Sequence, residues 1–418
     1  MNPIPPSQRR PQRIAILPGD GTGKDVTAEA VKVLEAAAET WDLPLELVHL
    51  DWDADRYLAT GETLPKGALE DFRDNYSAIF IGAYGDPRVP DMKHAADILL
   101  GIRFGLDLFI NLRPVRLYDA RLCPLKDRTE KHVDFVVFRE NTEGAYVNVG
   151  GNFKKGTPDE VAVQEEIHTR KGVERIIRAA FDYAVEHGRR EVLMSDKSNV
   201  MRYGHDLWQR TFTEVGAEYP QIETRHMFVD ALTMQMVKSP DSLDVIVTNN
   251  MFGDIITDLG AALQGGLGVA ASANLHPGQT SMFEPVHGSA PKYAGTGRAN
   301  PVGAILSATL MLDYLGHAEA AKVLDDAVAR SFREGNTTPD LGGSLTTSQV
   351  GDLLARAVSR VAVAREGNVR PTRALTSPAL LSQPPVHPPG EEGVDSPSYS
   401  EQGLPLPVGG REDGRGLG

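Results

Sequence analysis

Two aspartates four residues apart are the first sign of chemistry in this sequence. Asp254 and Asp258 follow an apolar run, residues 243–248, that is typical of a short buried strand. On a helix, side chains at this spacing leave the same face one turn apart. Two carboxylates there repel unless a cation lies between them, and oxygen ligands of this kind suit Mg²⁺ or Mn²⁺. An isolated pair of this kind is more often a solvated helix face, but the apolar, glycine-rich flanks predict a cleft, with Asn250 as the helix cap.

Three arginines predict a site for an anion. Arg103 and Arg113 are ten residues apart, and Arg139 directly follows the apolar segment 133–138. The planar guanidinium group matches a carboxylate in a bidentate manner. A single arginine is more often a surface charge, but three at one cleft would suit a substrate with two carboxylates.

Tyr146 and Lys197 are the candidate proton carriers. A tyrosine close to cations gives up its proton more readily, because positive charge stabilises the phenolate. A lysine in a crowded, partly dry site can act as a general base. Without further motifs, a tyrosine at an interface and a lysine in solvent are more common than a catalytic pair.

Composition limits the class of protein. The 418 residues suffice for two domains with sizeable cores. The net charge of -14 argues against binding to nucleic acid or to an anionic membrane surface. The single cysteine, Cys123, excludes an intrachain disulfide, and the longest apolar stretch, residues 304–315, is too short to span a bilayer. We therefore expect a soluble, cytoplasmic protein.

The elements that position these residues alternate between strand and helix, which predicts an α/β fold with a mostly parallel sheet. Strands are expected at residues 13–17, 45–50, 78–83, 133–138, 191–194 and 243–248, and helices at 24–40, 66–73, 172–187, 255–263 and 304–315. Residues 150–156 are expected to form a loop and residues 162–167 a projecting arm. Residues 1–12 are predicted to be a loose arm, and the proline- and glycine-rich residues 365–418 a disordered tail.

Several motifs together resemble one family. The run N-M-F-G-D-I-I-T-D-L at 250–259 resembles the metal-binding signature of the β-decarboxylating dehydrogenases, which include isocitrate, isopropylmalate, homoisocitrate and tartrate/D-malate dehydrogenases. Further matching motifs are G-D-G-T-G at 19–23, L-R-P-V-R at 112–116, R-E-N-T-E-G-A-Y at 139–146, D-K-S-N-V at 196–200 and E-P-V-H-G-S-A-P at 284–291. The resemblance implies a large cofactor-binding domain (13–108 and 265–364) and an inserted dimerisation domain (109–264).

The resemblance also implies roles for these residues. Asp254 and Asp258 would hold Mg²⁺ or Mn²⁺ together with Asp230 of the partner subunit. Lys197 of the partner subunit would act as base, and Tyr146 would protonate the carbanion. The residues expected to bind substrate are Leu99, Leu100, Arg103, Arg113, Arg139, Asn199 and Val200. Each active site would draw on two chains, so a homodimer would be obligatory.

The cofactor segment carries mixed signals. The residues expected to bind the dinucleotide are Glu284, His287, Gly288, Ser289, Ala290, Lys292, Tyr293 and Asn300. NAD-dependent isopropylmalate enzymes have an aspartate where Lys292 stands, and Lys292-Tyr293 resembles the NADP-dependent isocitrate enzymes. The run P-D-L-G-G at 339–343 is closer to the isopropylmalate and homoisocitrate type. NADP is therefore favoured, and NAD remains a candidate.

The helix before Arg103 indicates the substrate. Isocitrate enzymes place a serine and an asparagine where Asp97 and Leu99 stand, so isocitrate is disfavoured. Leu99 and Leu100 match the leucines of the isopropyl pocket, although Ala96 replaces its usual glutamate. We predict oxidative decarboxylation of a 3-substituted malate, foremost 3-isopropylmalate in leucine biosynthesis. The alternatives are a tartrate/D-malate dehydrogenase, then a homoisocitrate or isocitrate dehydrogenase, and, outside the enzymes, a metal-dependent ligand-binding protein of the same fold.

Overall fold

The computed structural model describes residues 11–366, with side-chain burial up to residue 360. The predicted loose arm and disordered tail lie outside this range, apart from their inner ends. Gln12 begins the first strand, and residues 365–366 end the last helix.

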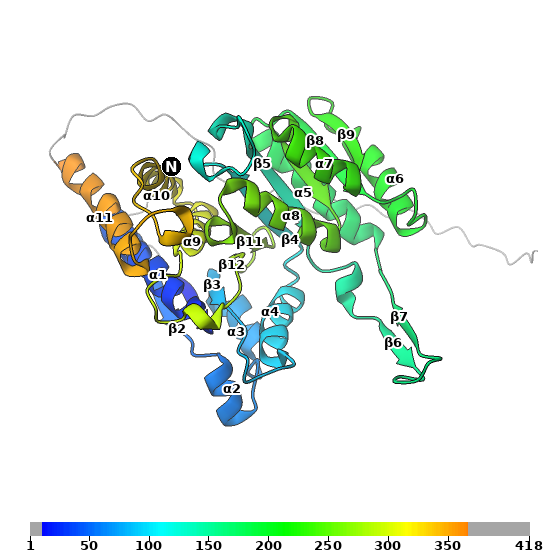
Figure 1. The fold of residues 1–418 in the computed structure, drawn as a ribbon, viewed down its shortest axis with the longest axis horizontal. Coiled ribbons are helices and arrows are strands. Elements are labelled where there is room, and N and C mark those ends of the chain that lie inside the picture. The colour runs from blue at the N-terminus through cyan, green and yellow to red at the C-terminus, as the bar shows by residue number, and fades with distance from the viewer. Residues whose placement is uncertain (1–10, 367–418) are drawn as a thin grey trace, which may run out of the picture. The chain divides into compact units, whose positions relative to one another are not determined.

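Ten strands form one sheet in the order β2-β1-β3-β12-β11-β4-β5-β10-β8-β9 (Figure 1). Their bounds are β1 Gln12–Gly19, β2 Leu45–His49, β3 Ala78–Ala83, β4 Ile110–Arg116, β5 Asp134–Glu140, β8 Glu191–Asp196, β9 Glu223–Phe228, β10 Val245–Thr248, β11 Ala271–Leu275 and β12 Ser281–Pro285. The α-helices are α1 Thr22–Trp41, α2 Ala54–Thr60, α3 Ala68–Asn75, α4 Lys93–Gly105, α5 Arg170–Glu186, α6 Gly204–Gly216, α7 Val229–Lys238, α8 Asn250–Gln264, α9 Val302–Tyr314, α10 Ala318–Arg333 and α11 Thr347–Glu366.

The sheet is mostly parallel, as predicted. Strands β2, β1, β3 and β12 are parallel neighbours, and so are β5, β10, β8 and β9. Antiparallel pairings of β12 with β11, β11 with β4 and β4 with β5 join these two parallel sets. Every residue of β3 and β10 is buried, which explains why both are uninterrupted apolar runs.

The strand order groups the chain as the predicted domain division does. Strands from residues 13–108 and 265–364 occupy one end of the sheet, and strands from residues 109–264 occupy the other. The described residues nevertheless belong to one compact unit. The two-domain boundaries therefore stay a prediction.

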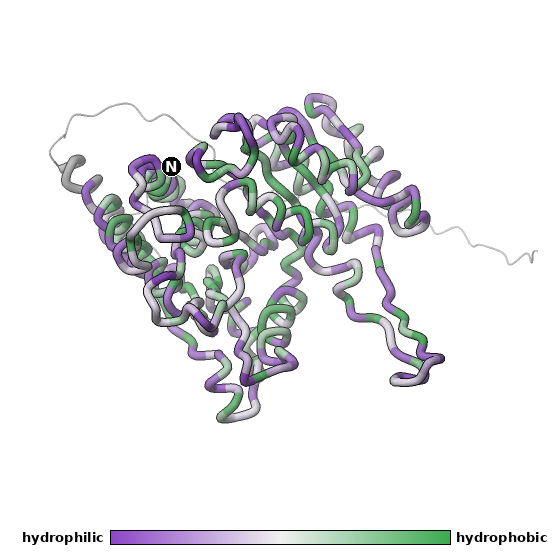
Figure 2. The backbone as a smooth tube through the Cα atoms, viewed as in Figure 1, coloured by the Kyte–Doolittle hydropathy of each residue, from purple (hydrophilic) through white to green (hydrophobic). Residues whose placement is uncertain are grey.

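A separate antiparallel pair, β6 (Gly150–Phe153) and β7 (Val161–Gln164), forms the predicted arm. The expectation of a loop over residues 150–156 is wrong for 150–153, because Gly150 pairs with Gln164 and the pairing continues to Phe153. Every residue of both strands is exposed, including Phe153 at 67%. Figure 2 shows that apolar residues occur along this hairpin as well as in the large sheet.

The core helix predicted at 304–315 is α9, which is buried along most of its length between the sheet and its neighbours α1 and α10. Within residues 11–366, none of the helices combines the length and the apolar character needed to cross a membrane.

Candidate active site

Helix α8 presents the two aspartates. Its cap is Asn249, whose side chain accepts a hydrogen bond from the Phe252 backbone N–H at 2.9 Å. The prediction that Asn250 is the cap is wrong, because the helix already begins at that residue. Asn250 instead accepts hydrogen bonds from Arg139, at 2.8 Å to its carbonyl oxygen and 2.7 Å to its side-chain oxygen.

Asp254 is the centre of a charged cluster. Its Oδ1 lies 2.5 Å from Arg139 Nη1 and 3.4 Å from Arg113 Nη1, and its Oδ2 accepts a 2.8 Å hydrogen bond from the Tyr146 hydroxyl. Burial acts to raise the pKa of Asp254, but the charges of Arg139 and Arg113 outweigh it and hold the pKa below its ordinary value. The carboxylate is therefore ionised at neutral pH, as a cation ligand must be.

The three predicted arginines converge from α4, β4 and β5. Arg139 is 2% exposed, and Arg103 reaches Glu284 of β12 at 2.6 Å. Burial lowers the pKa of Arg113 and of Arg139. Repulsion from Arg103 lowers both further, and repulsion from Arg113 also lowers the pKa of Arg139. An anion bound among these guanidinium groups would relieve that repulsion, which supports a site for a dicarboxylate.

Two of the arginines border a cavity of about 160 Å³. The predicted site residues that line it are Leu99, Arg103, Arg113, Glu284, His287 and Gly288, joined by Tyr84 and Ser272 among others. Leu100 is half-buried and does not line this cavity. The Asp97 carboxylate forms an ion pair with Lys93 and accepts a hydrogen bond from Thr63. It is therefore not an unpaired charge that faces the substrate. Glu284 is predicted to bind the cofactor, but in the structure its carboxylate forms an ion pair with Arg103.

Tyr146 lies in the short 3₁₀ turn Ala145–Val147, with its ring centroid 5.2 Å from the Arg139 guanidinium carbon. Burial raises the pKa of Tyr146, Arg139 opposes this, and the hydrogen bond to Asp254 raises the pKa again. The net pKa is above the ordinary value, because burial and the contact with Asp254 outweigh the effect of Arg139. The further lowering expected from a bound metal ion stays a prediction. A tyrosine that keeps its proton is suited to donate it.

Lys197 and Asp230 form a second group. The Lys197 Nζ lies 2.9 Å from Asp230 Oδ1, and the preceding Asp196 is buried and accepts hydrogen bonds from His226 and Gln209. The turn that follows exposes the other two predicted residues of this loop, Asn199 and Val200.

Within residues 11–366 the three predicted metal ligands do not come together in one chain. Asp258 is exposed one turn beyond Asp254, while Asp230 pairs with Lys197. The only described histidines, cysteines or acidic residues that gather three ligand atoms within 4.8 Å are Glu166, His168 and His205. The chemistry of three carboxylates fits Mg²⁺ or Mn²⁺, but in this chain only Asp254 and Asp258 share a helix face.

A second cavity, of about 500 Å³, adjoins the first through His287 and Gly288. Other predicted cofactor residues that line it are Ala290, Tyr293 and Asn300. Lys292 is exposed and does not line this cavity, but its Nζ lies 4.8 Å from the ring centroid of Tyr293. The sequence interpretation missed Arg298, whose guanidinium carbon lies 5.6 Å from the same centroid.

The glycine run after β1 packs against the cofactor segment. The Ser289 carbonyl accepts hydrogen bonds from the backbone N–H and hydroxyl of Thr22, at 2.7 and 2.9 Å. Gly21 has φ of +53°, and a Cβ there would lie 2.3 Å from the same carbonyl oxygen. Only glycine fits this approach. Ser289 thus connects the cofactor segment to α1 and does not line the cavity.

Comparison with known proteins decides the family. The model of the isocitrate/isopropylmalate dehydrogenase family matches residues 13–354. The chain belongs to this family. It is 47% identical to 3-isopropylmalate dehydrogenase of Thermobifida fusca over 352 residues, which cover 84% of this chain and 98% of that protein. The corresponding enzyme of Streptomyces griseus is 45% identical and covers 82% and 97%.

Solved structures agree. Isocitrate dehydrogenase from Methylococcus capsulatus superimposes with a TM-score of 0.76 at 34% identity, covering 83% of this chain and 99% of that one. The resemblance, the α/β fold and the enzyme class predicted from the motifs are therefore confirmed: this is a member of a family of decarboxylating dehydrogenases.

Proposed function

We propose that this family member oxidises and decarboxylates a 3-substituted malate, with 3-isopropylmalate as the preferred substrate and leucine biosynthesis as its setting. The observation that carries the proposal is the convergence of Arg103, Arg113 and Arg139 beside a cavity lined by Leu99. Three cations suit two carboxylates, and the leucine offers an apolar surface to the alkyl group. The relatives named 3-isopropylmalate dehydrogenase support this substrate.

The proposed roles are those that the family resemblance implies. Lys197 of the partner subunit takes the hydroxyl proton of the substrate, and Tyr146 returns a proton to the carbon that has lost CO₂. Asp254, Asp258 and Asp230 of the partner subunit would hold Mg²⁺ or Mn²⁺. When bound, the cation supplies Lewis-acid stabilisation of negative charge.

A homodimer is proposed because much apolar surface is exposed near these residues. The exposed apolar side chains are Phe153, Val161 and Val163 on the hairpin, Val200 and Tyr203 after β8, Met234 and Val237 on α7, and Met251 and Ile255 on α8. Patches of this kind mark subunit interfaces. Placing α7 and α8 against a second copy would bring Lys197 and Asp230 of each chain towards the Asp254 of the other. We also infer a cytoplasmic location from the single cysteine.

The cofactor is proposed to be NADP, with NAD as the alternative. The Lys292 Nζ lies 4.8 Å and the Arg298 guanidinium carbon 5.6 Å from the centroid of the Tyr293 ring, and Tyr293 and Arg298 line the 500 Å³ cavity. A 2′-phosphate would be attracted there, and the aspartate that would repel it is absent. Asp340, in the same cavity, already accepts hydrogen bonds from Asn300 and Thr338.

Lys292→Asp is expected to reverse this preference. The variant should lose about tenfold or more in kcat/KM for NADP, because one charge-assisted contact is replaced by repulsion, while kcat/KM for NAD stays within about threefold. Steady-state kinetics with both nicotinamides measure the ratio, with Lys322→Asp on the exposed face of α10 as the control. An unchanged ratio would mean that Lys292 does not contact the phosphate.

The proposed function is tested by a steady-state panel of 3-isopropylmalate, D-malate, tartrate, isocitrate and homoisocitrate with each nicotinamide and Mg²⁺ or Mn²⁺. The highest kcat/KM is expected for 3-isopropylmalate. Because Leu100 does not line the small cavity, a smaller malate is the second candidate. A higher kcat/KM for D-malate than for 3-isopropylmalate would identify the smaller malate as the substrate.

A further inference from the structure

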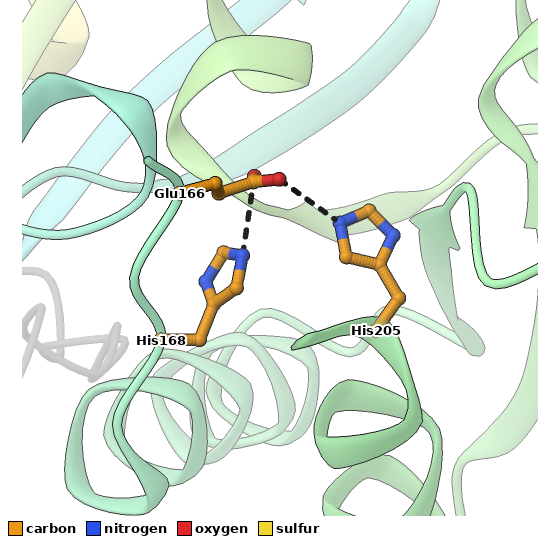
Figure 3. A group of neighbouring side chains, drawn as sticks. All are labelled: Glu166, His168 and His205. Atoms are coloured by element: carbon orange, nitrogen blue, oxygen red, sulfur yellow. Dashed lines mark ion pairs between the residues drawn. The ribbon is translucent and has the colours of Figure 1, made fainter. Parts of the chain in front are cut away.

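Glu166, His168 and His205 form a partly buried cluster to which the proposed function assigns no role (Figure 3). His205 is on α6, and the other two lie between the hairpin and α5. The Glu166 carboxylate points between the two rings, with Oε1 3.1 Å from His168 Nε2 and Oε2 3.8 Å from His205 Nε2. The side chains of the two histidines are 2% and 0% exposed. Two histidines and a carboxylate in this arrangement suggest a zinc site.

The outer nitrogens of the rings argue against zinc. His205 Nδ1 accepts a 2.7 Å hydrogen bond from the Lys197 backbone N–H, and His168 Nδ1 accepts a 3.3 Å hydrogen bond from the Trp208 indole N–H. Neither Nδ1 therefore carries a proton, and in a neutral ring the proton must be on Nε2, facing Glu166. A zinc ligand has the opposite arrangement, with a free Nε2 lone pair and an N–H donated outwards by Nδ1.

Asn249 also contacts the Glu166 carboxylate, and it donates a hydrogen bond to it. Asn249 Nδ2 lies 2.9 Å from Glu166 Oε1 and 3.3 Å from His205 Nε2. The Asn249 side-chain oxygen accepts the capping bond from Phe252, so its nitrogen must be the group that faces Glu166. Two N–H donors thus approach each other, and the negative charge of Glu166 offsets their repulsion. Burial acts to raise the pKa of Glu166, but the two histidines lower it to about 2, which keeps the carboxylate ionised.

We propose that Glu166 and His205 are positioning residues for the reaction: the negative charge of Glu166, 3.8 Å from His205 Nε2, favours the tautomer whose Nδ1 accepts from the Lys197 backbone, and Glu166 holds the start of helix α8 through its hydrogen bond from Asn249. One carboxylate at the base of the hairpin thereby fixes both the loop of the proposed base and the helix that carries Asp254. The inference rests on the proposed function for its catalytic consequence, but the tautomers and contacts do not depend on it.

The first test uses three variants. Glu166→Gln keeps the shape but removes the negative charge that offsets the repulsion between the N–H donors, and His205→Leu removes the acceptor for the Lys197 N–H. Both are expected to lower kcat by about 10- to 100-fold, since small displacements of catalytic groups have effects of this size, with KM changed by no more than about threefold. His205→Asn presents its side-chain oxygen near the place of Nδ1 and should recover kcat to within about fivefold of the unaltered enzyme. Equal kcat in all three folded variants, or no recovery with asparagine, would overturn the positioning role.

The second test needs neither a variant nor turnover. Nitrogen NMR of the ¹⁵N-histidine-labelled full chain should show pyridine-type Nδ1 and pyrrole-type Nε2 signals for both His168 and His205, unchanged when Zn²⁺ is added. Rings protonated on both nitrogens, or signals shifted by stoichiometric Zn²⁺, would overturn the proposal. If the unaltered enzyme turned over no malate, the proposed function would fail while this measurement still decided the tautomers.

Discussion

Replacing Lys197 by methionine is expected to abolish most of the oxidation of 3-isopropylmalate. Loss of a positioned general base costs about 10²- to 10⁴-fold in kcat, and KM should change little because the carboxylates are held by arginines. The substitution removes an ion pair with Asp230 whose two side chains are 26% and 68% exposed. A pair this open to solvent contributes little to stability, so the thermal stability of the variant should be close to that of the unaltered enzyme.

Lys322→Met is the matched control for this experiment. Lys322 also forms an ion pair with an aspartate, Asp326, at the same distance of 2.9 Å, on α10. The Lys322→Met substitution should leave kcat unchanged. If Lys197→Met retained kcat within about tenfold of the unaltered enzyme, the assignment of Lys197 as the base would be wrong.

Asp254→Asn is expected to have the second large effect, because the carboxylate serves both a cation and the arginines. An amide cannot supply the ionised oxygen, so Mn²⁺ binding measured by electron paramagnetic resonance should weaken by about 100-fold or more. The same change leaves Arg139 and Arg113 without their anionic partner, and kcat/KM should fall by at least about 100-fold.

The matched control is Asp325→Asn on α10. Asp325 also accepts from an arginine and a tyrosine, with Arg116 and the Tyr118 hydroxyl each at 2.6 Å. It should alter neither Mn²⁺ binding nor turnover. Undiminished Mn²⁺ affinity in Asp254→Asn would remove Asp254 from the metal site.

Several of the elements that carry the candidate site could be predicted, since strands buried on both faces and capped helices leave strong local signals. Strand β3 was predicted with its observed bounds from one apolar run. Strand β4 was missed because Arg113, Pro114 and Arg116 interrupt it, and β6 was missed because two glycines resemble a loop. The cap of α8 was misplaced by one residue, because two adjacent asparagines offer the same signal and only the packing of Arg139 distinguishes them.

The candidate site could be predicted where the chemistry of a residue type indicates its role. It could not be predicted where a property depends on contacts with distant segments. The three arginines and the Asp254 face followed from their chemistry and motifs. The raised pKa of Tyr146 did not, since it depends on burial and on the hydrogen bond to Asp254. Arg298 could have been found as a basic residue in the glycine-rich cofactor segment. The Glu166 cluster had no sequence signal, because its members come from separate elements.

Each active site is proposed to combine Asp254 of one chain with Lys197 of the partner subunit. Differently tagged Lys197→Met and Asp254→Asn chains can be coexpressed, and the mixed dimer isolated through both tags. In a shared site both defects fall in one cleft and the other cleft is intact, so the mixed dimer should have about half the activity of the unaltered dimer, although both parent variants are inactive. A mixed dimer as inactive as its parents would show that each site lies within one chain and would contradict a shared active site.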